Sequence, residues 1–303
     1  MLRKALWALV TAVVCLAAPA VMRAQMEYLD VYTVKVKPEK SAEFNALARK
    51  VADANRKFNG DHWLATENVY GEGDTFSFVS YREDYASIDK ATDVFMGALQ
   101  KAFGKEGSEK LLHDWENCLI SSQSELRRRR LDLSRKAPSD AAGMAKLIGE
   151  SRMVRTTAVH VRPGRIAEFE ATLKELKEAG EKNPYTQPLL VSQGVEGTKG
   201  TIFYITSVRS SLGGFDKNPT AKEVLGEEGY KNYQHMSAET VESAESTLRH
   251  FSPELSNAPD EIAQVAADFW RPKQTVAAVT PKTKAAAVKA AEVKATAPDK
   301  PQR

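Results

Sequence analysis

Two histidines at matching places are the first candidates for chemistry. His113 and His235 lie 122 positions apart, as do Gly104 and Gly226 in the same stretches. A neutral imidazole nitrogen binds a metal ion or haem iron, and a protonated imidazole binds an anion. The pair is therefore a candidate ligand-binding site. The alternative is that both are helix-surface or capping residues, because no other histidine or carboxylate recurs beside both.

A lysine and a histidine form a second matched pair. Lys35 and His160 each stand between two valines in segments that alternate like strands. Successive side chains of a strand point to opposite faces, so both residues lie on the face opposite the valines. They are candidates for lining the interior of a barrel and binding a ligand there. The alternative is a solvated or hydrogen-bonded polar position near a strand end.

An arginine run from Arg127 to Arg130 supplies the third candidate. Guanidinium groups hold phosphate or carboxylate groups through paired hydrogen bonds. Only Arg127 has a counterpart in the repeat described below, which is Arg249. These two arginines are therefore ligand-binding candidates, and the alternative for the run is an edge strand guarded by charge.

Other kinds of site are not indicated. The sequence has no phosphate-binding glycine loop, no paired zinc-type cysteines and no serine nucleophile elbow. We therefore expect no metal, and we assign no catalytic residue and no cofactor. Cys118 is the only cysteine besides Cys15, so we expect no intrachain disulfide once the N-terminal segment is removed.

The predicted strands and helices that position these residues occur twice in the sequence. Segment 33–38, TVKVKP, matches segment 158–163, AVHVRP, at a spacing of 125 positions, and a later match equates Phe78 with Tyr204. So many matches in one order indicate an internal repeat. The predicted organisation is a first copy at residues 25–134, a linker at 135–151, a second copy at 152–257 and a helical extension at 258–271.

Each copy predicts the order strand, helix, strand, strand, helix, strand. The expected elements of the first copy are a strand at 28–36, a helix from 38, strands at 63–70 and 75–81, a helical region at 84–123 and a strand around 126. In the second copy the long helical region is expected at 220–243 and the last strand around 248. This order is the split βαβ arrangement of ferredoxin-like α+β units.

Given this element order and the Val-x-Val-x-Pro junction at 34–38, each copy resembles the dimeric α/β-barrel superfamily, which includes antibiotic-biosynthesis monooxygenase-like and NIPSNAP-like domains. The resemblance covers residues 27–134 and 152–256. It implies two tandem ferredoxin-like units that form an intrachain pseudo-dimeric α/β barrel, and hence a monomer. The superfamily includes haem-binding enzymes, cofactor-free oxygenases and proteins without known activity, so it implies no single activity.

The N-terminal residues predict a signal peptide at 1–24. Arg3 and Lys4 precede an apolar run, and small residues at Ala20 and Ala24 suit cleavage. The run is shorter than a bilayer span of roughly 20 residues, which disfavours the alternative of an uncleaved anchor. A periplasmic or secreted location follows as an expectation.

Basic charge is confined to the two ends of the sequence. Without residues 1–24 the net charge falls from +3 to 0, because Arg3, Lys4 and Arg23 leave with no acidic group. Residues 272–303 carry seven basic and two acidic side chains, which leaves the body between the ends near −5. This Ala/Lys/Pro-rich tail is predicted to be disordered. It is a candidate for contact with an acidic envelope polymer or lipid, or alternatively a solvated linker, and no nucleic-acid partner is expected.

Three functions remain open at this point. The leading hypothesis is an exported barrel protein that binds a small apolar or anionic ligand. The second is an oxygenase of the barrel type, either haem-dependent or cofactor-free, although the Asn, Trp and His set of the cofactor-free monooxygenases cannot be placed in either copy. The third is an envelope structural protein tethered by the basic tail.

Overall fold

The computed structural model describes residues 28–271. The predicted signal peptide at 1–24 and the predicted tail at 272–303 lie outside the described residues. Residues 28–271 belong to one compact unit. Within them no helix has both the length and the apolar character needed to cross a bilayer.

The first half has the predicted element order. Its elements are β1 (Tyr28–Val36), a 3-10 turn (Pro38–Lys40), α1 (Ser41–Lys57), β2 (Leu64–Tyr70), β3 (Thr75–Arg82), α2 (Tyr85–Asn117) and β4 (Leu119–Arg129). The helical region expected to reach residue 123 ends at Asn117, so that boundary was wrong. Residues 119–123 instead belong to β4, where they pair with residues 33–36 of β1.

The second half repeats the order after a short helix. Its elements are α3 (Ala141–Gly149), β5 (Met153–Val161), α4 (Ile166–Lys182), β6 (Leu190–Glu196), β7 (Thr201–Arg209), α5 (Ala221–Thr240) and β8 (Val241–Phe251). Two short helices follow, α6 (Asp260–Ala263) and α7 (Ala267–Trp270). Helix α3 lies in the predicted linker, and α5 ends at Thr240 rather than at 243, again because the next strand begins earlier.

The eight strands form one closed antiparallel barrel in the order β1-β3-β2-β8-β5-β7-β6-β4. Within each half the last strand pairs with the first, and the halves join through β2 with β8 and β4 with β6. A closed barrel has no strand edge. The edge-strand interpretation of Arg127 to Arg130 was therefore wrong, because β4 is paired on both sides.

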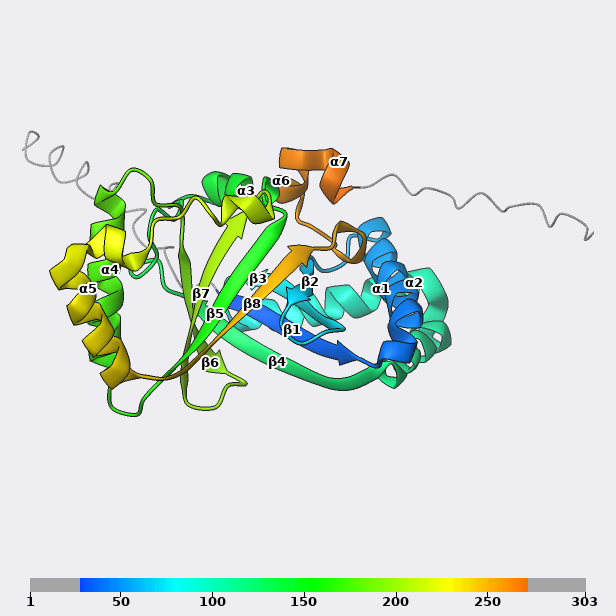
Figure 1. Cartoon of the computed structure of the whole chain (residues 1–303). Coiled ribbons are helices and arrows are strands. Elements are labelled where there is room, and N and C mark those ends of the chain that lie inside the picture. The colour runs from blue at the N-terminus through cyan, green and yellow to red at the C-terminus, as the bar shows by residue number, and fades with distance from the viewer. Residues whose placement is uncertain (1–27, 272–303) are drawn as a thin grey trace, which may run out of the picture. The chain divides into compact units, whose positions relative to one another are not determined.

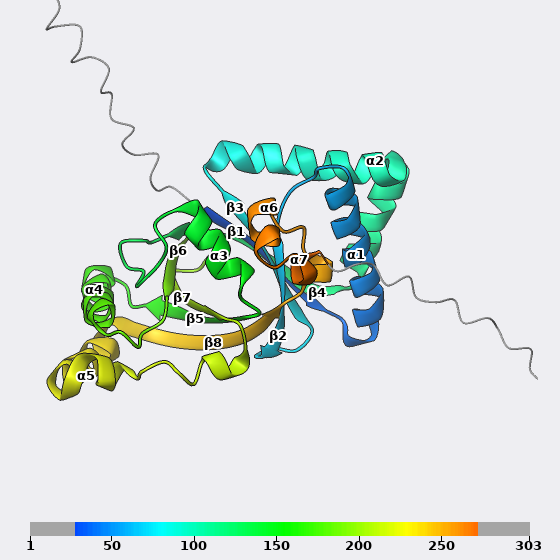
Figure 2. The same cartoon turned by 90° about the horizontal axis from the view of Figure 1, so that it is seen from above.

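Helices cover the outside of the barrel. Figures 1 and 2 show α1 and α2 beside the first-half strands, and α4 and α5 on the opposite side. The first core packs Val34 and Val36 of β1 and Phe76 of β3 against α1 and α2. The smaller second core packs Val159 of β5 and Phe203 of β7 against α4. Because side chains alternate along a strand, the residues between these core positions face the barrel interior.

A third apolar cluster connects the barrel to the helices that follow it. Val154, Val208 and Phe251 pack with Ala263 and Trp270 from the C-terminal helices. The indole nitrogen of Trp270 also donates a hydrogen bond of 3.0 Å to the Gly149 carbonyl oxygen at the end of α3. The predicted helical extension at 258–271 therefore packs against the ends of β5, β7 and β8.

Candidate functional site

The interior face of the barrel carries many polar side chains. Thr33 of β1 shares a hydrogen bond of 3.0 Å with Ser77 of β3, and Thr156 of β5 shares one of 3.1 Å with Thr206 of β7. These two pairs are cross-strand neighbours. These hydrogen bonds satisfy the four hydroxyl groups. The charged side chains nearby are therefore what distinguishes the barrel interior.

A charged cluster forms where β4 and β7 face each other. The Oε2 atom of Glu125 accepts hydrogen bonds from Arg127 Nε at 2.9 Å and from the Tyr204 hydroxyl at 2.8 Å, and it forms an ion pair with Arg127 Nη2 at 2.7 Å. The guanidinium carbon of Arg127 lies 3.5 Å from the centroid of the Tyr204 ring. A planar guanidinium stacks well on an aromatic face. The three side chains therefore hold one another in place.

Arg249 of β8 brings a second positive charge to this region. Its Nε donates a hydrogen bond of 2.8 Å to Asn68 Oδ1 of β2. Among residues 28–271 no carboxylate lies within ion-pair distance of Arg249. The Arg249 charge is held by an amide and is not neutralised by an adjacent acid.

The pKa directions report how enclosed these groups are. Burial chiefly lowers the pKa of Arg249 to about 10, and the nearby charge of Arg127 lowers it further while Glu125 and Glu245 oppose the change. Burial likewise raises the pKa of Tyr204 well above its ordinary value, with Arg127 opposing the rise and Glu125 adding to it. The predicted candidates Arg127 and Arg249 thus lie near each other, in a region shielded from water.

Lys35 and His160 occupy corresponding places on β1 and β5. The neighbours of Lys35, Val34 and Val36, are in the core, so Lys35 takes an interior-facing position. Its ammonium forms an ion pair with Glu72 in the turn between β2 and β3. His160 is half-buried and is paired across the sheet with Ile202 and Ser243. Neither residue forms a hydrogen bond with Arg127 or Arg249.

His113 and His235 lie elsewhere. Both are exposed, His113 on α2 and His235 on α5. These helices flank opposite sides of the barrel in both views (Figures 1 and 2), so the structure does not bring the two histidines together. Within the described residues no group of three or more His, Cys, Asp or Glu side chains is placed to hold a metal ion.

Sequence reasoning missed the partners that orient the arginines. Glu125 stands two positions before Arg127 on β4, and that spacing alone could have placed both on one face of the strand. Asn68 had no sequence signal, because its contact with Arg249 crosses from one half to the other. Tyr204 was equated with Phe78.

The strand register corrects that alignment by one residue. Val34 pairs with Phe76 in the first half, and Val159 pairs with Phe203 in the second. Phe76 and Phe203 therefore correspond, and Ser77 takes the place of Tyr204. Phe78 packs against the first core, whereas Tyr204 faces the barrel interior.

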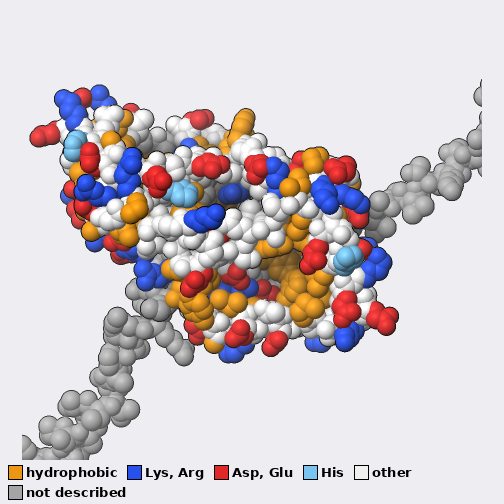
Figure 3. Space-filling view, turned by 90° about the horizontal axis from the view of Figure 1, so that it is seen from below, with side chains coloured by type: hydrophobic (Ala, Val, Ile, Leu, Met, Phe, Trp, Pro, Cys, Tyr) orange, Lys and Arg blue, Asp and Glu red, His pale blue; other side chains and the backbone are white. Residues whose placement is uncertain are grey.

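The face opposite α6 and α7 is hollowed. Figure 3 shows hydrophobic side chains gathered in and beside the hollow, with acidic and basic side chains around it. Two shallow surface pockets lie elsewhere, one beside Arg152 and Phe269 and the other beside Lys182 and Tyr185. The charged cluster of the barrel is separate from both pockets.

Comparison with known proteins identifies similar folds only. No protein-family model matches the chain, and no curated protein matches it. A putative monooxygenase from Lactobacillus acidophilus NCFM is 10% identical with a TM-score of 0.46, over 77% of this chain and 98% of its own. An anthrone oxidase-like protein is 13% identical with a TM-score of 0.49, over 77% and 94%.

A third solved structure, the putative chlorite dismutase TA0507, is 9% identical with a TM-score of 0.45, over 80% of this chain and 99% of its own. Likenesses at these values say nothing about activity.

Proposed function

We propose that this chain is an exported, non-catalytic barrel protein that binds a small, partly apolar ligand through its carboxylate or similar anionic group. The observation that carries the proposal is Arg249, which is enclosed in the barrel, fixed by Asn68 and without a carboxylate partner among residues 28–271. An enclosed cation is strongly stabilised by a matching anion. A ligand carboxylate supplies one.

The surrounding charges support an anionic group of a single charge. Glu125 neutralises the charge of Arg127. The positive charge that remains in the cluster is therefore that of Arg249. Apolar side chains stand nearby, since Val31 is paired across the sheet with Val79 on one side and with Glu125 on the other. The ligand expected from this setting has one anionic end and an apolar body.

We also propose that the two halves are a tandem duplication acting as an intrachain pseudo-dimer. The two halves share their element order, and β4 and β8 are the corresponding last strands that carry Arg127 and Arg249. The body should then be a monomer, because the barrel closes within one chain. Light scattering that shows an obligate dimer would contradict this part of the proposal.

The binding proposal is tested with two matched probes. Octanoate and octanamide share an apolar chain and differ in charge, so only octanoate should bind measurably by calorimetry. Arg249→Gln should weaken octanoate binding on the order of tenfold or more. Arg162→Gln is the control, because Arg162 is exposed on the segment after β5. Equal binding of the two probes, or binding unaffected by Arg249→Gln, would refute the proposal.

The oxygenase alternative is tested by identifying the molecule that copurifies with the protein from its native compartment. His113 and His235 are exposed, and His62 and His250 contact Asn257 and Glu67, so among the described histidines His160 on the interior face of β5 is the candidate axial ligand for haem iron. Native mass spectrometry should find a small carboxylate. A Soret band in the visible spectrum would instead favour a haem protein. The envelope hypothesis is tested by pull-down on anionic vesicles with and without residues 272–303.

A further inference from the structure

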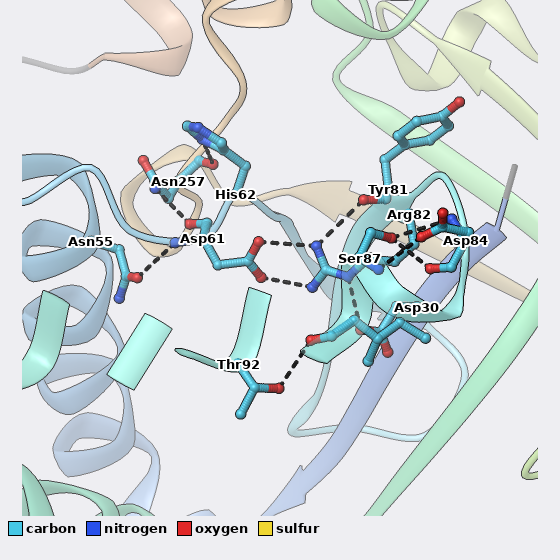
Figure 4. Close-up of polar contacts among 11 residues, drawn as sticks. Asp30, Asn55, Asp61, His62, Tyr81, Arg82, Asp84, Ser87, Thr92 and Asn257 are labelled. Atoms are coloured by element: carbon cyan, nitrogen blue, oxygen red, sulfur yellow. Dashed lines mark hydrogen bonds and ion pairs between the residues drawn. The ribbon is translucent and has the colours of Figure 1, made fainter. Parts of the chain in front are cut away.

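A buried arginine at the end of β3 is fully satisfied by two acids. Arg82 is 8% exposed, and its Nη1 and Nη2 atoms donate to the two carboxylate oxygens of Asp61 at 2.9 and 2.7 Å. Its Nε lies 3.3 Å from Asp30 Oδ2. Figure 4 shows the guanidinium enclosed between these two side chains. The paired bonds and the second carboxylate make the enclosure of this charge favourable.

The corresponding arginine of the second half is Arg209 at the end of β7. Tyr28 pairs with Arg82 across β1 and β3, and Met153 pairs with Arg209 across β5 and β7. Arg209 is also 8% exposed. Its Nη1 donates to the Val208 carbonyl oxygen at 2.7 Å, whereas its Nε and Nη2 are enclosed and have no hydrogen-bond partner among residues 28–271.

Both acids that satisfy Arg82 have been replaced in the second half. Asp30 stands two positions after Tyr28, and the same place after Met153 is held by Arg155. Asp61 stands four positions after the end of α1, and the same place after α4 is held by Thr186, whose hydroxyl bonds to the Gly180 and Asn183 carbonyls. The buried arginine is kept while its counter-ions are lost.

The surroundings of Arg209 are basic and aromatic. The ring centroid of Phe215 lies 5.5 Å from the guanidinium carbon of Arg209 and 4.8 Å from that of Arg155. Burial chiefly lowers the pKa of Arg209, and the charges of Arg155 and Arg135 lower it further. Arg135 donates to the Gln187 carbonyl. A guanidinium enclosed in this way is a costly arrangement unless an anion reaches it.

We propose that Arg209 and Arg155 bind an oxyanion group, such as a phosphate, sulfate or carboxylate, beneath the ring of Phe215. The Nε and Nη2 atoms of Arg209 form one edge of its guanidinium, and such an edge matches two oxygens of an oxyanion. Arg155 is exposed and can close on the anion from the solvent side. Because the Nε and Nη2 atoms of Arg209 are enclosed, binding requires the ring of Phe215, which follows the short turn Leu212–Gly214, to move aside.

This site is distinct from the barrel interior. Ser207, Ile205 and Phe203 lie two, four and six positions before Arg209, so all four residues share one face of β7. Phe203 packs into the second core outside the barrel. Tyr204 faces the opposite side of the same strand. The oxyanion site can therefore be tested independently of ligand binding at Arg249.

Thermal melts of the full chain test the proposal. Sodium phosphate, sulfate and acetate are compared with sodium chloride at matched ionic strength. We expect a saturable rise in Tm with at least one oxyanion, because ligand that binds only the native state stabilises it. The order among the three anions identifies the preferred group. A rise no larger than that with chloride for all three anions would overturn the proposal.

Two variants and two controls complete the test. Arg155→Asp places a carboxylate where the first half has Asp30, so it should raise Tm in chloride and remove the oxyanion-specific rise. Arg209→Met should also remove that rise. Arg162→Gln should keep it, and melts of Arg155→Asp in the Arg249→Gln background remove any contribution of the barrel interior. An oxyanion response that survives in Arg155→Asp at native strength would refute the site, and this result decides the matter even if Arg209→Met does not fold.

Discussion

Arg127 and Tyr204 meet on a single carboxylate oxygen, Glu125 Oε2, with the guanidinium of Arg127 stacked on the Tyr204 ring. Arg127 comes from the last strand of the first half and Tyr204 from the third strand of the second half. The contact therefore links the halves through side chains inside the barrel. The backbone pairing of β4 with β6 links them a second time.

Tyr204→Phe removes the hydroxyl from this contact and keeps the ring. We expect the free energy of unfolding to fall by about 1 to 2 kcal/mol, because a hydrogen bond to a charged acceptor is lost. Urea denaturation measures the change. Tyr70→Phe is the control, since Tyr70 is 68% exposed, and it should stay within about 0.5 kcal/mol of the native protein. Equal effects of the two variants would show that the Glu125 contact contributes nothing.

The same tyrosine predicts a loss of stability in alkali. Burial raises the pKa of Tyr204 in the folded chain above its ordinary value of 10.0. Above about pH 10 the unfolded chain therefore loses the tyrosine proton while the folded chain keeps it, and stability falls as pH rises. Tyr204→Phe should show a shallower fall than the native protein in urea denaturation between pH 9 and 11. Parallel pH curves for the two proteins would contradict the enclosure of Tyr204.

The enclosed pair of Arg82 and Asp61 gives a larger expected effect. Asp61→Ala leaves Arg82 with only Asp30 beside it. Loss of one partner of a buried ion pair costs about 3 to 5 kcal/mol, and the remaining Asp30 favours the lower end of that range. Asp132→Ala is the matched control, because Asp132 also pairs with an arginine but is half exposed. Asp132→Ala should lower the free energy of unfolding by less than about 1 kcal/mol, as measured by calorimetry. Equal losses of stability in Asp132→Ala and Asp61→Ala would contradict the prediction.

A glycine beside the junction of the halves separates crowding from backbone strain. Gly197 and Gly200 both have positive φ angles, 74° and 70°. A Cβ at Gly197 would collide with the Ser124 carbonyl oxygen of β4, whereas one at Gly200 would meet open space. Gly200→Ala should cost roughly 1 to 2 kcal/mol from its φ angle. Gly197→Ala should cost at least about 1 kcal/mol more, and denaturation curves that coincide would argue against close packing of this turn on β4.

The sequence predicts the elements better than it predicts what they bring together. The repeated Val-x-Val-x-Pro segments place β1 and β5 and the helices that follow them, because local periodicity determines which side of a strand or helix is apolar. The strand alternation also places Lys35 opposite the valines. Pairing between strands is not local, so the contact of Asn68 with Arg249 could not be read from the chain.

The misaligned tyrosine shows why the interior was harder to predict than the core. Equating Phe78 with Tyr204 matched two aromatic residues but shifted β7 by one position. A shift of one residue exchanges the two faces of a strand. It hid the fact that Tyr204 faces Glu125 and that Arg82 corresponds to Arg209, and both relationships became visible only from the register of the pairs.

The repeated histidines give the last prediction. His113 and His235 are exposed on α2 and α5, so neither packs in a core. We expect His113→Ala and His235→Ala each to change the free energy of unfolding by less than about 0.5 kcal/mol, because exposed substitutions away from caps and networks have small effects. Thermal melts measure this, and a loss of 1 kcal/mol or more in either variant would point to a structural role.

A binding measurement on the same two variants decides the remaining question. Native mass spectrometry of each variant, purified like the native chain, shows whether the copurified molecule is kept. Loss in both variants would establish the matched histidines as a ligand site despite their separation on opposite sides of the barrel. If both variants keep the copurified molecule, the matched histidines have no role in binding it. Because the charged cluster lies in the barrel interior, we expect retention in both histidine variants and loss in Arg249→Gln.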